Sequence, residues 1–247
     1  MGSSEQPEAR SALGPFWAIV RADLGGLFRS KLTYGWLLVA VFIQVIRTVG
    51  SRDAMAVSAV VPSGLGDLVY IWALVLIGLS ASSVSSEAGE LADSILSKSV
   101  TRLDYILAKF VSRISYTLAT FSAVTLALVG LGLRLEVGDY DPLGLLAAVL
   151  LVALALVMLT TMGVGLSVAT SSSVLAIVTL LVLWYAMTVL SPVVGLGALS
   201  PGSLLSMLPD LVKGVWTSGE WESALAFTAV SAASVAISAA YFHMKDI

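Results

Sequence analysis

Long apolar runs alternate with one strongly charged stretch, and this alternation restricts the chain to folds in which apolar helices cross a membrane. The charged stretch, residues 82–113, holds eight of the 29 acidic and basic residues. Apolar runs flank it at residues 68–79 and 114–133. A charged segment between two spans is typical of a loop that returns the chain to water. We therefore expect residues 82–113 to begin outside the membrane and to lead into the next span.

Composition agrees with a membrane protein and excludes several functions. Hydrophobic residues make up 58% of the chain and charged residues only 12%, whereas soluble domains carry about 25% charged residues. The net charge of −3 argues against a nucleic-acid partner, which requires a basic surface. Without cysteine there is no disulfide and no thiolate metal site, and the single histidine, His243, cannot form a histidine cluster. We expect no metal site and no catalytic residues.

The apolar runs predict an all-α integral membrane protein. A span needs about 20 residues to cross the ~30 Å hydrocarbon core. We expect a disordered tail at residues 1–12 and a single transmembrane domain at residues 13–247, with residues 50–64 as an outer connection. The six predicted spans cover about residues 32–49, 65–85, 106–133, 142–170, 174–190 and 221–244.

Capping signals mark three helix starts. Thr101 with Asp104 three residues later is typical of a capping box. Asp141 and Ser200 are each followed by proline, which is favoured at the first helical position. We expect the helix after Ser200 to be short and to break at Pro209. The surrounding segment, residues 191–219, is too interrupted to span a membrane and too apolar for a solvated loop, so it needs burial in protein.

Residues 13–31 form an amphipathic pattern, which differs from the uniformly apolar pattern of a membrane span. The charges Arg21, Asp23, Arg29 and Lys31 are expected to face away from the apolar side, which favours a helix lying in the headgroup plane. The apolar side consists of Leu13, Phe16, Trp17, Val20, Leu24, Leu27 and Phe28, which recur at three- and four-residue spacing.

Small residues on the predicted fourth span indicate helix packing. Gly163, Gly165, Ser167 and Ala169 follow small-x-x-x-small spacings, which usually allow close helix contact and do not by themselves mark a substrate site. Asp67, near the start of the second span, is expected to cap a helix or face outer water.

The distribution of basic residues orients the chain. With the N-terminus inside, nine basic residues fall on the inner side and four on the outer side, as the positive-inside rule requires. We therefore expect a multi-pass protein of the cytoplasmic membrane with both termini cytosolic. The inner residues are Arg10, Arg21, Arg29, Lys31, Lys98, Arg102, Lys109, Arg113 and Lys245, and the outer ones are Arg47, Arg52, Arg134 and Lys213.

A degenerate motif within the charged stretch resembles one found in type-2 ABC exporter permeases. Glu87 and Glu90 stand at its acidic position, residues 95–102 resemble its Leu-Leu-Ser-x-Pro-Val-Ser-Arg core, and Tyr105 with Lys109 match its Tyr-x-x-Gly-Lys end. Two departures are present: the Gly-Thr pair of the family motif is missing, and Ser99 replaces the usual proline. Residues 13–31 and 191–219 also resemble the elbow helix and the short external helices of that family.

The resemblance implies a specific function. Such a permease pairs with an ABC ATPase subunit that binds ATP and magnesium, forms a homodimer or related heterodimer, and works by alternating access among membrane lipids. Gln44 would help to line the substrate path. No cofactor is implied in this chain, which has no phosphate-binding Gly-x-x-x-x-Gly-Lys motif and is not itself an enzyme. The implied coupling residues are Glu87, Glu90, Leu91, Ile95, Leu96 and Arg102.

The alternative is an ATP-independent secondary transporter or a membrane scaffold. Ion-coupled transporters usually carry ionisable residues within their spans. Between residues 114 and 190 the only charges are those of the turn at 134–141, which weighs against ion coupling. Energy would then have to come from a separate subunit.

Overall fold

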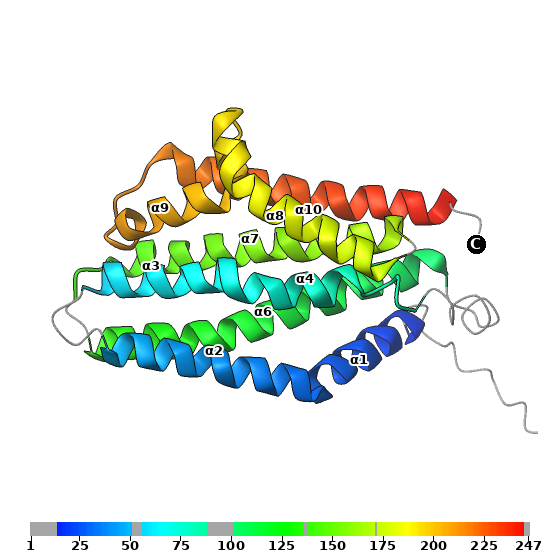
Figure 1. Cartoon of the computed structure of the whole chain (residues 1–247), viewed down its shortest axis with the longest axis horizontal. Helices are drawn as coiled ribbons and strands as arrows, with labels where there is room; N and C mark the ends of the chain where they lie inside the picture. Colours follow the sequence, from blue (N-terminus) through cyan, green and yellow to red (C-terminus); the bar gives the residue numbers. More distant parts are fainter. Residues whose placement is uncertain (1–13, 51–55, 88–100, 136–137, 171, 245–247) are drawn as a thin grey trace, which may run out of the picture.

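The structure, a computed structural model, describes residues 14–50, 56–87, 101–135, 138–170 and 172–244, and it is helical almost throughout (Figure 1). These residues contain no β-strand. Within these described ranges, six helical spans are long and apolar enough to cross a membrane, so the chain is a multi-pass membrane protein. The spans are α2 (Lys31–Gly50), the continuous helix of α3 (Val57–Asp67), η1 (Leu68–Trp72) and α4 (Ala73–Ala81), then α6 (Arg102–Leu135), α7 (Pro142–Ala169), α8 (Ser173–Val193) and α10 (Ser218–Met244).

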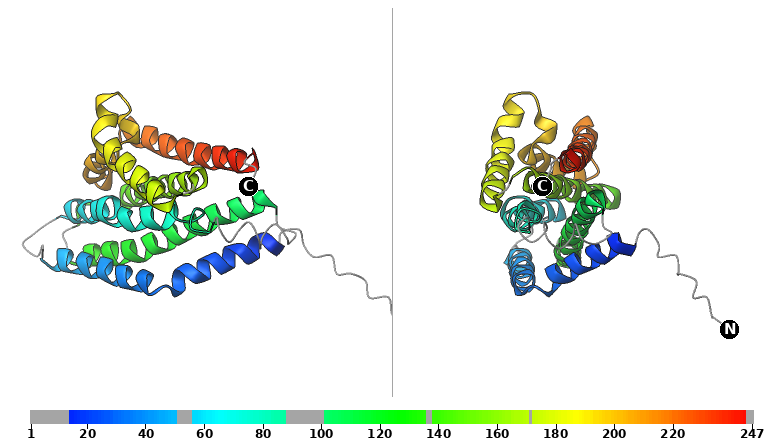
Figure 2. Two further views of the ribbon diagram at one scale, coloured as in Figure 1. Left: turned by 45° about the vertical axis from the view of Figure 1, so that its right-hand side comes forward. Right: turned by 90° about the vertical axis from the view of Figure 1, so that its right-hand side faces the viewer.

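Three further helices occur in the described parts of the chain. Helix α1 (Gly14–Arg29) precedes the first span and is separated from it by Ser30, while η2 (Gly197–Leu199) and α9 (Pro201–Val212) lie between the last two spans. Helix α1 begins and α10 ends at the same end of the bundle (Figure 1). Figure 2 shows α1 and α2 on one side of the bundle and α8 and α10 on the other, with the remaining spans between them.

The second span and α7 form the centre of the bundle. Within their most apolar windows, 61% and 56% of residues are buried, against 22%, 17% and 17% for α2, α8 and α10. The outer three spans therefore leave most of their apolar side chains for lipid or for another protein. Leu128, Leu159 and Leu180, from three different spans, are fully buried in the shared core.

The second span starts earlier than the sequence pattern predicts. Its helix begins at Val57, so residues 57–64 are not part of an outer connection, and it ends at Ala81 in place of residue 85. Pro62 lies inside the helix, although proline there removes one backbone hydrogen bond. Val57, Val61 and Leu65 are fully buried, and this packing outweighs the local preference of Pro62 for a turn.

A wide turn interrupts the second span at its middle. Residues Leu68–Trp72 adopt a π-helical turn, a form that loosens the regular backbone ladder. Two side chains of α8 donate to carbonyls of this turn: Trp184 Nε1 to the Val69 oxygen at 3.1 Å and Tyr185 Oη to the Tyr70 oxygen at 2.6 Å. Helix α8 is thereby attached to the second span by two hydrogen bonds.

The predicted helix starts are confirmed. The Thr101 hydroxyl accepts from the Asp104 amide at 3.1 Å, and the Asp141 carboxylate accepts from the Gly144 amide at 2.7 Å. The Ser200 hydroxyl likewise caps α9 by accepting from the amide three residues later.

The predicted break at Pro209 is wrong. Helix α9 continues through this residue to Val212. Leu204, Leu208 and Leu211 are fully buried against the bundle, and this continuous apolar stripe holds the helix together beyond the proline.

Small residues on α7 do allow close packing, on two sides of the helix. A Cβ added at Gly163 would overlap the Ser80 hydroxyl of α4, and one added at Gly165 would lie 2.8 Å from the Ser234 hydroxyl of α10. Helices without bulky side chains at the contact can approach closely. The packing expected from the spacing is therefore present.

Candidate functional site

Four charged side chains meet where α1 lies against the first turns of α6, and we call them the ion cluster: Asp23, Glu87, Lys109 and Arg113. Lys109 Nζ lies 3.0 Å from Asp23 Oδ1 and 2.6 Å from Glu87 Oε1. Arg113 Nη2 lies 3.4 Å from the same Asp23 oxygen. Two cations are balanced by two carboxylates, so the cluster as a whole is neutral.

Local sequence explains why these groups meet. Lys109 and Arg113 are four residues apart on α6 and so share one face of the helix. Asp23 comes from the side of α1 that packs on α6. Glu87 follows the turn after α4, which is fixed to α7 because the Ser167 hydroxyl accepts from the Val84 amide at 2.9 Å. Three segments distant in sequence are thus joined at one point.

The two cations are almost completely buried. Lys109 is 3% exposed and Arg113 is 8% exposed. Burying a charge costs several kcal/mol unless it is paired and hydrogen-bonded, and here each cation has a carboxylate partner. Removing one side chain of the ion cluster therefore leaves a buried charge on another without its counter-charge.

Further hydrogen bonds reach the carboxylates of Asp23 and Glu87. The Ser112 hydroxyl donates to Asp23, and the Tyr105 hydroxyl donates to Glu87 Oε2 at 2.8 Å. The Tyr105 ring also stacks on Phe242 near the end of α10, with ring centroids 6.2 Å apart. The cluster is thus connected to the last span as well as to α1, α4 and α6.

Asp23 is held in its ionised form. Burial alone would raise the pKa of the Asp23 carboxyl, but Arg113 and Lys109 outweigh burial and lower that pKa below its ordinary value of 3.8. A carboxyl with a lowered pKa stabilises the folded state above its unfolded pKa, and that contribution is lost as the pH falls through the folded pKa. The Asp23 contacts are accordingly intact at neutral pH.

An open hollow of about 330 Å³ lies beside the ion cluster. Ile19 and Ala22 of α1 form its apolar part, and Asp23, Glu87 and Lys109 form its polar part. No group of three His, Cys, Asp or Glu residues suited to a metal occurs in the described part of the chain. The carboxylates of the cluster are already paired with cations, so the cluster joins α1 and the turn after α4 to α6.

The residues of the predicted coupling motif are only partly described. Glu87 belongs to the ion cluster, and Arg102 is the first residue of α6. Glu90, Leu91, Ile95 and Leu96 lie outside the described residues. The described residues on either side of this gap are in contact, since Glu87 bonds to both Tyr105 and Lys109.

The prediction that Asp23 faces away from the apolar side of its helix is wrong. Asp23 points toward α6, together with the buried residues Val20 and Leu27. The signal available in the sequence was the pair Lys109 and Arg113, because two cations at the start of a span need an acidic partner. Nothing in the sequence pattern identified Asp23 as that partner.

Two other polar residues of the spans have structural roles. Gln44 is fully buried, and its Nε2 donates to the Gly64 carbonyl at 3.2 Å, so it joins α2 to α3 in this structure. Asp67 forms an ion pair with Arg47 at 2.6 Å. It is neither a helix cap nor a carboxylate facing only water.

No protein-family model matches this chain, and no curated protein matches it either. The class that the fold and the ion cluster define is a six-span helical membrane protein with a helix before its first span. A more specific assignment of function rests on how the residues of this chain are arranged.

Proposed function

We propose that this chain is the membrane-spanning permease subunit of an ABC exporter, which moves its substrate across the cytoplasmic membrane by alternating access. One observation carries the proposal: Tyr105 and Lys109, which match the end of the permease motif, both bond to Glu87 at its acidic position. Glu87 precedes Tyr105 and Lys109 by 18 and 22 residues, so these bonds join the two ends of the motif. The order of the helices along the chain also supports the proposal.

The ion cluster gives the proposed subunit a route for mechanical coupling. A separate ABC ATPase, carrying ATP and magnesium, would press on residues 88–101 as it closes. Glu87 and Lys109 would pass the displacement to α6, and Asp23 would pass it to α1. A second permease, identical or related, would cover part of the exposed apolar surface of α2, α8 and α10.

Helix α1 has features of a helix in the headgroup plane, the role that we propose for it. Val20 and Leu27 pack against the bundle, whereas Trp17 is 57% exposed. Tryptophan is enriched at the level of the headgroups. For the segment between the last two spans, we propose that η2 and α9 lie on the outer side.

The proposed contact with the ATPase is tested by Leu96→Asp. An apolar anchor at an interface often contributes about 2 kcal/mol or more, which is roughly thirtyfold in affinity. We expect the variant to lose the ATPase while remaining folded. The permease would be co-purified with an ABC ATPase encoded beside it, and retained partner and ATP-dependent transport would be measured.

Ser99→Asp is the matched control, because it adds the same charge to the same segment without removing an apolar side chain. It is expected to retain the ATPase. Undiminished binding and transport in Leu96→Asp would contradict the proposed coupling role of residues 88–101.

The proposed topology predicts a pattern of cysteine labelling. The chain has no cysteine, so single cysteines can be introduced without background. A membrane-impermeant maleimide should reach Ser97→Cys and Ser172→Cys only from the cytosol, and Gly138→Cys and Ser218→Cys only from outside. Labelling of position 138 from the cytosolic side would exclude the proposed orientation.

A further inference from the structure

Helices α1 and α2 meet in a bend at Ser30 (Figure 1). The Thr33 hydroxyl holds this bend, because it donates to the Leu27 carbonyl at 2.7 Å and lies 2.9 Å from the Tyr116 hydroxyl of α6. Thr33 and Tyr116 are both buried. The backbone at the bend is therefore fixed against the bundle, and side chains that point outward from it have a defined position.

Three polar residues lie on the outside of this bend, and we call them the basic junction: Arg29, Lys31 and Tyr34. Arg29 ends α1, Lys31 begins α2, and Tyr34 lies almost one turn further along α2. Arg29 and Lys31 are exposed, and Tyr34 is 64% exposed. Because Lys31 and Tyr34 are three residues apart, they share one face of α2.

The two cations of the basic junction have no carboxylate partner in the described part of the chain. Asp23 is the only acidic residue of α1 and α2, and it already belongs to the ion cluster. Asp104 is the only acidic residue of α6, and it lies 12 residues from Tyr116, which is about 18 Å along the helix. The positive charges of Arg29 and Lys31 are therefore not balanced by these helices.

Two helices place the basic junction at a boundary of the hydrocarbon region. Helix α2 has 20 residues and is about 30 Å long, which equals the thickness of the hydrocarbon core. Its first residue, Lys31, therefore lies at one boundary of that core. Helix α6 gives the same depth, because Tyr116 lies 18 residues before Arg134, or about 27 Å along the helix. Lipid headgroups begin directly outside this boundary.

Apolar side chains continue from the basic junction along α2. Leu38 and Phe42 follow Lys31 by seven and eleven residues, so they lie on the same face of the helix. Leu38 is 70% exposed and Phe42 is 59% exposed. A lipid with its phosphate at the basic junction would have an acyl chain beside these two side chains.

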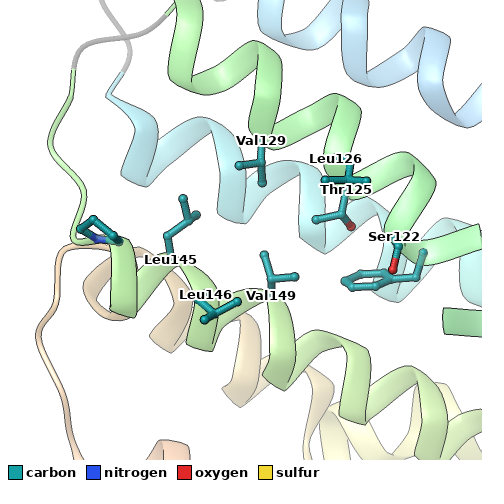
Figure 3. A pocket seen from close by; sticks show the side chains of 9 residues that line it. Ser122, Thr125, Leu126, Val129, Leu145, Leu146 and Val149 are labelled. Carbon is teal, nitrogen blue, oxygen red and sulfur yellow. The ribbon is translucent and has the colours of Figure 1, made fainter. Parts of the chain in front are cut away.

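A hollow on the side of the bundle differs from the basic junction in its charge. It has a volume of about 370 Å³ and lies between α6 and α7 (Figure 3). Val129 and Val149 contribute to its lining, and none of its lining residues is charged. A lipid that touches this hollow is therefore not selected by the charge of its headgroup, whereas a lipid at the basic junction meets two cations.

We propose that the basic junction binds the headgroup of an anionic glycerophospholipid. Arg29 and Lys31 bind its phosphate through charge-assisted hydrogen bonds, and the Tyr34 ring lies at the level of the headgroups. A zwitterionic lipid is a poorer ligand, because its own positive group is repelled by the two cations. The proposal needs no ATPase and does not rest on the proposed function.

Competition between two lipids for the full chain tests the site. The chain is purified in a neutral detergent and offered phosphatidylglycerol and phosphatidylcholine with identical acyl chains, and bound lipid is measured by native mass spectrometry. Wild type is expected to bind phosphatidylglycerol roughly thirtyfold more tightly, equivalent to about 2 kcal/mol, because each basic residue near an anionic lipid contributes about 1 kcal/mol. In the double variant Arg29→Gln/Lys31→Gln this preference should disappear.

Arg134→Gln/Lys213→Gln is the matched control, because both residues are exposed cations outside the basic junction. This variant removes the same amount of charge and should keep the preference for phosphatidylglycerol. An equal loss in both double variants would show only a general attraction between a less acidic protein and anionic lipid, and it would overturn the proposal. A wild type without any preference would overturn it as well.

Arg29→Lys/Lys31→Arg keeps both charges and is expected to retain the preference, so it remains informative if the glutamine variant fails to fold. Loss of the preference in this variant would show that charge at the basic junction does not select the lipid. A disulfide between two copies of Tyr34→Cys in vesicles would also overturn the proposal, because a second chain would then cover the basic junction. The chain has no cysteine of its own, so such a disulfide would be unambiguous.

Discussion

Replacing Lys109 with methionine is expected to lower the free energy of unfolding by about 3 kcal/mol. Lys109 is 3% exposed and contacts both carboxylates of the ion cluster. Methionine fills a similar space but leaves Asp23 and Glu87 without their shared cation. The midpoint of thermal unfolding of the purified protein in detergent would measure the loss.

Arg47→Met provides the matched control. Arg47 also pairs with one carboxylate, Asp67, but its side chain is 34% exposed. Arg47 stays partly hydrated and pairs with only one carboxylate, so this variant should lose clearly less stability than Lys109→Met, although Asp67 is left without its cation. Equal effects of Lys109→Met and Arg47→Met would show that burial does not strengthen the ion cluster.

A compensating change would separate lost charge from lost packing. Glu87→Gln in the Lys109→Met background removes the carboxylate for which Lys109 is the cationic partner. We expect the double variant to be more stable than Lys109→Met alone, with a coupling energy of at least about 0.5 kcal/mol. Additive effects would indicate that the loss came from packing.

Gly144→Ala is expected to destabilise the protein by about 3 kcal/mol. Gly144 lies in the first turn of α7, where an added Cβ would overlap the Leu211 carbonyl of α9. The clashing oxygen belongs to the backbone of α9, so a side-chain rotation cannot relieve the overlap. Moving α9 would also disturb the bond from the Asp141 amide to the Val212 carbonyl at 2.8 Å. Yield of monodisperse protein and its unfolding midpoint would both fall.

Gly130→Ala is the control for this prediction, because no atom lies within 4 Å of a Cβ added there. Alanine favours a helix interior over glycine by about 1 kcal/mol, so the variant should be as stable as wild type or more so. An unchanged midpoint in Gly144→Ala would mean that α9 is not held tightly against α7.

Much of the architecture could be predicted from local sequence. Apolar length predicted the spans, and side-chain caps such as Asp141 predicted where helices begin, since both depend on neighbouring residues. The start of the second span could not be predicted this way. Pro62 and Gly64 have the local character of a loop, and only the burial of Val61 and Leu65 against other helices makes that segment helical.

In the ion cluster too, local sequence predicts some features, and contacts between distant residues determine the others. The shared face of Lys109 and Arg113 follows from helix geometry, and the sequence placed both at the start of a span. Their partner Asp23 lies 86 residues from Lys109, and no local pattern specifies a pair so distant. The π-helical turn within Leu68–Trp72 had no recognisable signal either, because it depends on Trp184 and Tyr185 of another helix.

That turn limits how the bundle can rearrange. If α8 swung away from the second span, the carbonyls of Val69 and Tyr70 would lose the donors that α8 supplies. Each such hydrogen bond is worth about 0.5–1.5 kcal/mol. In the proposed transport cycle, α8 and the second span would keep these hydrogen bonds by moving together as one rigid body. The helix contacts that change during such a movement would then lie elsewhere in the bundle.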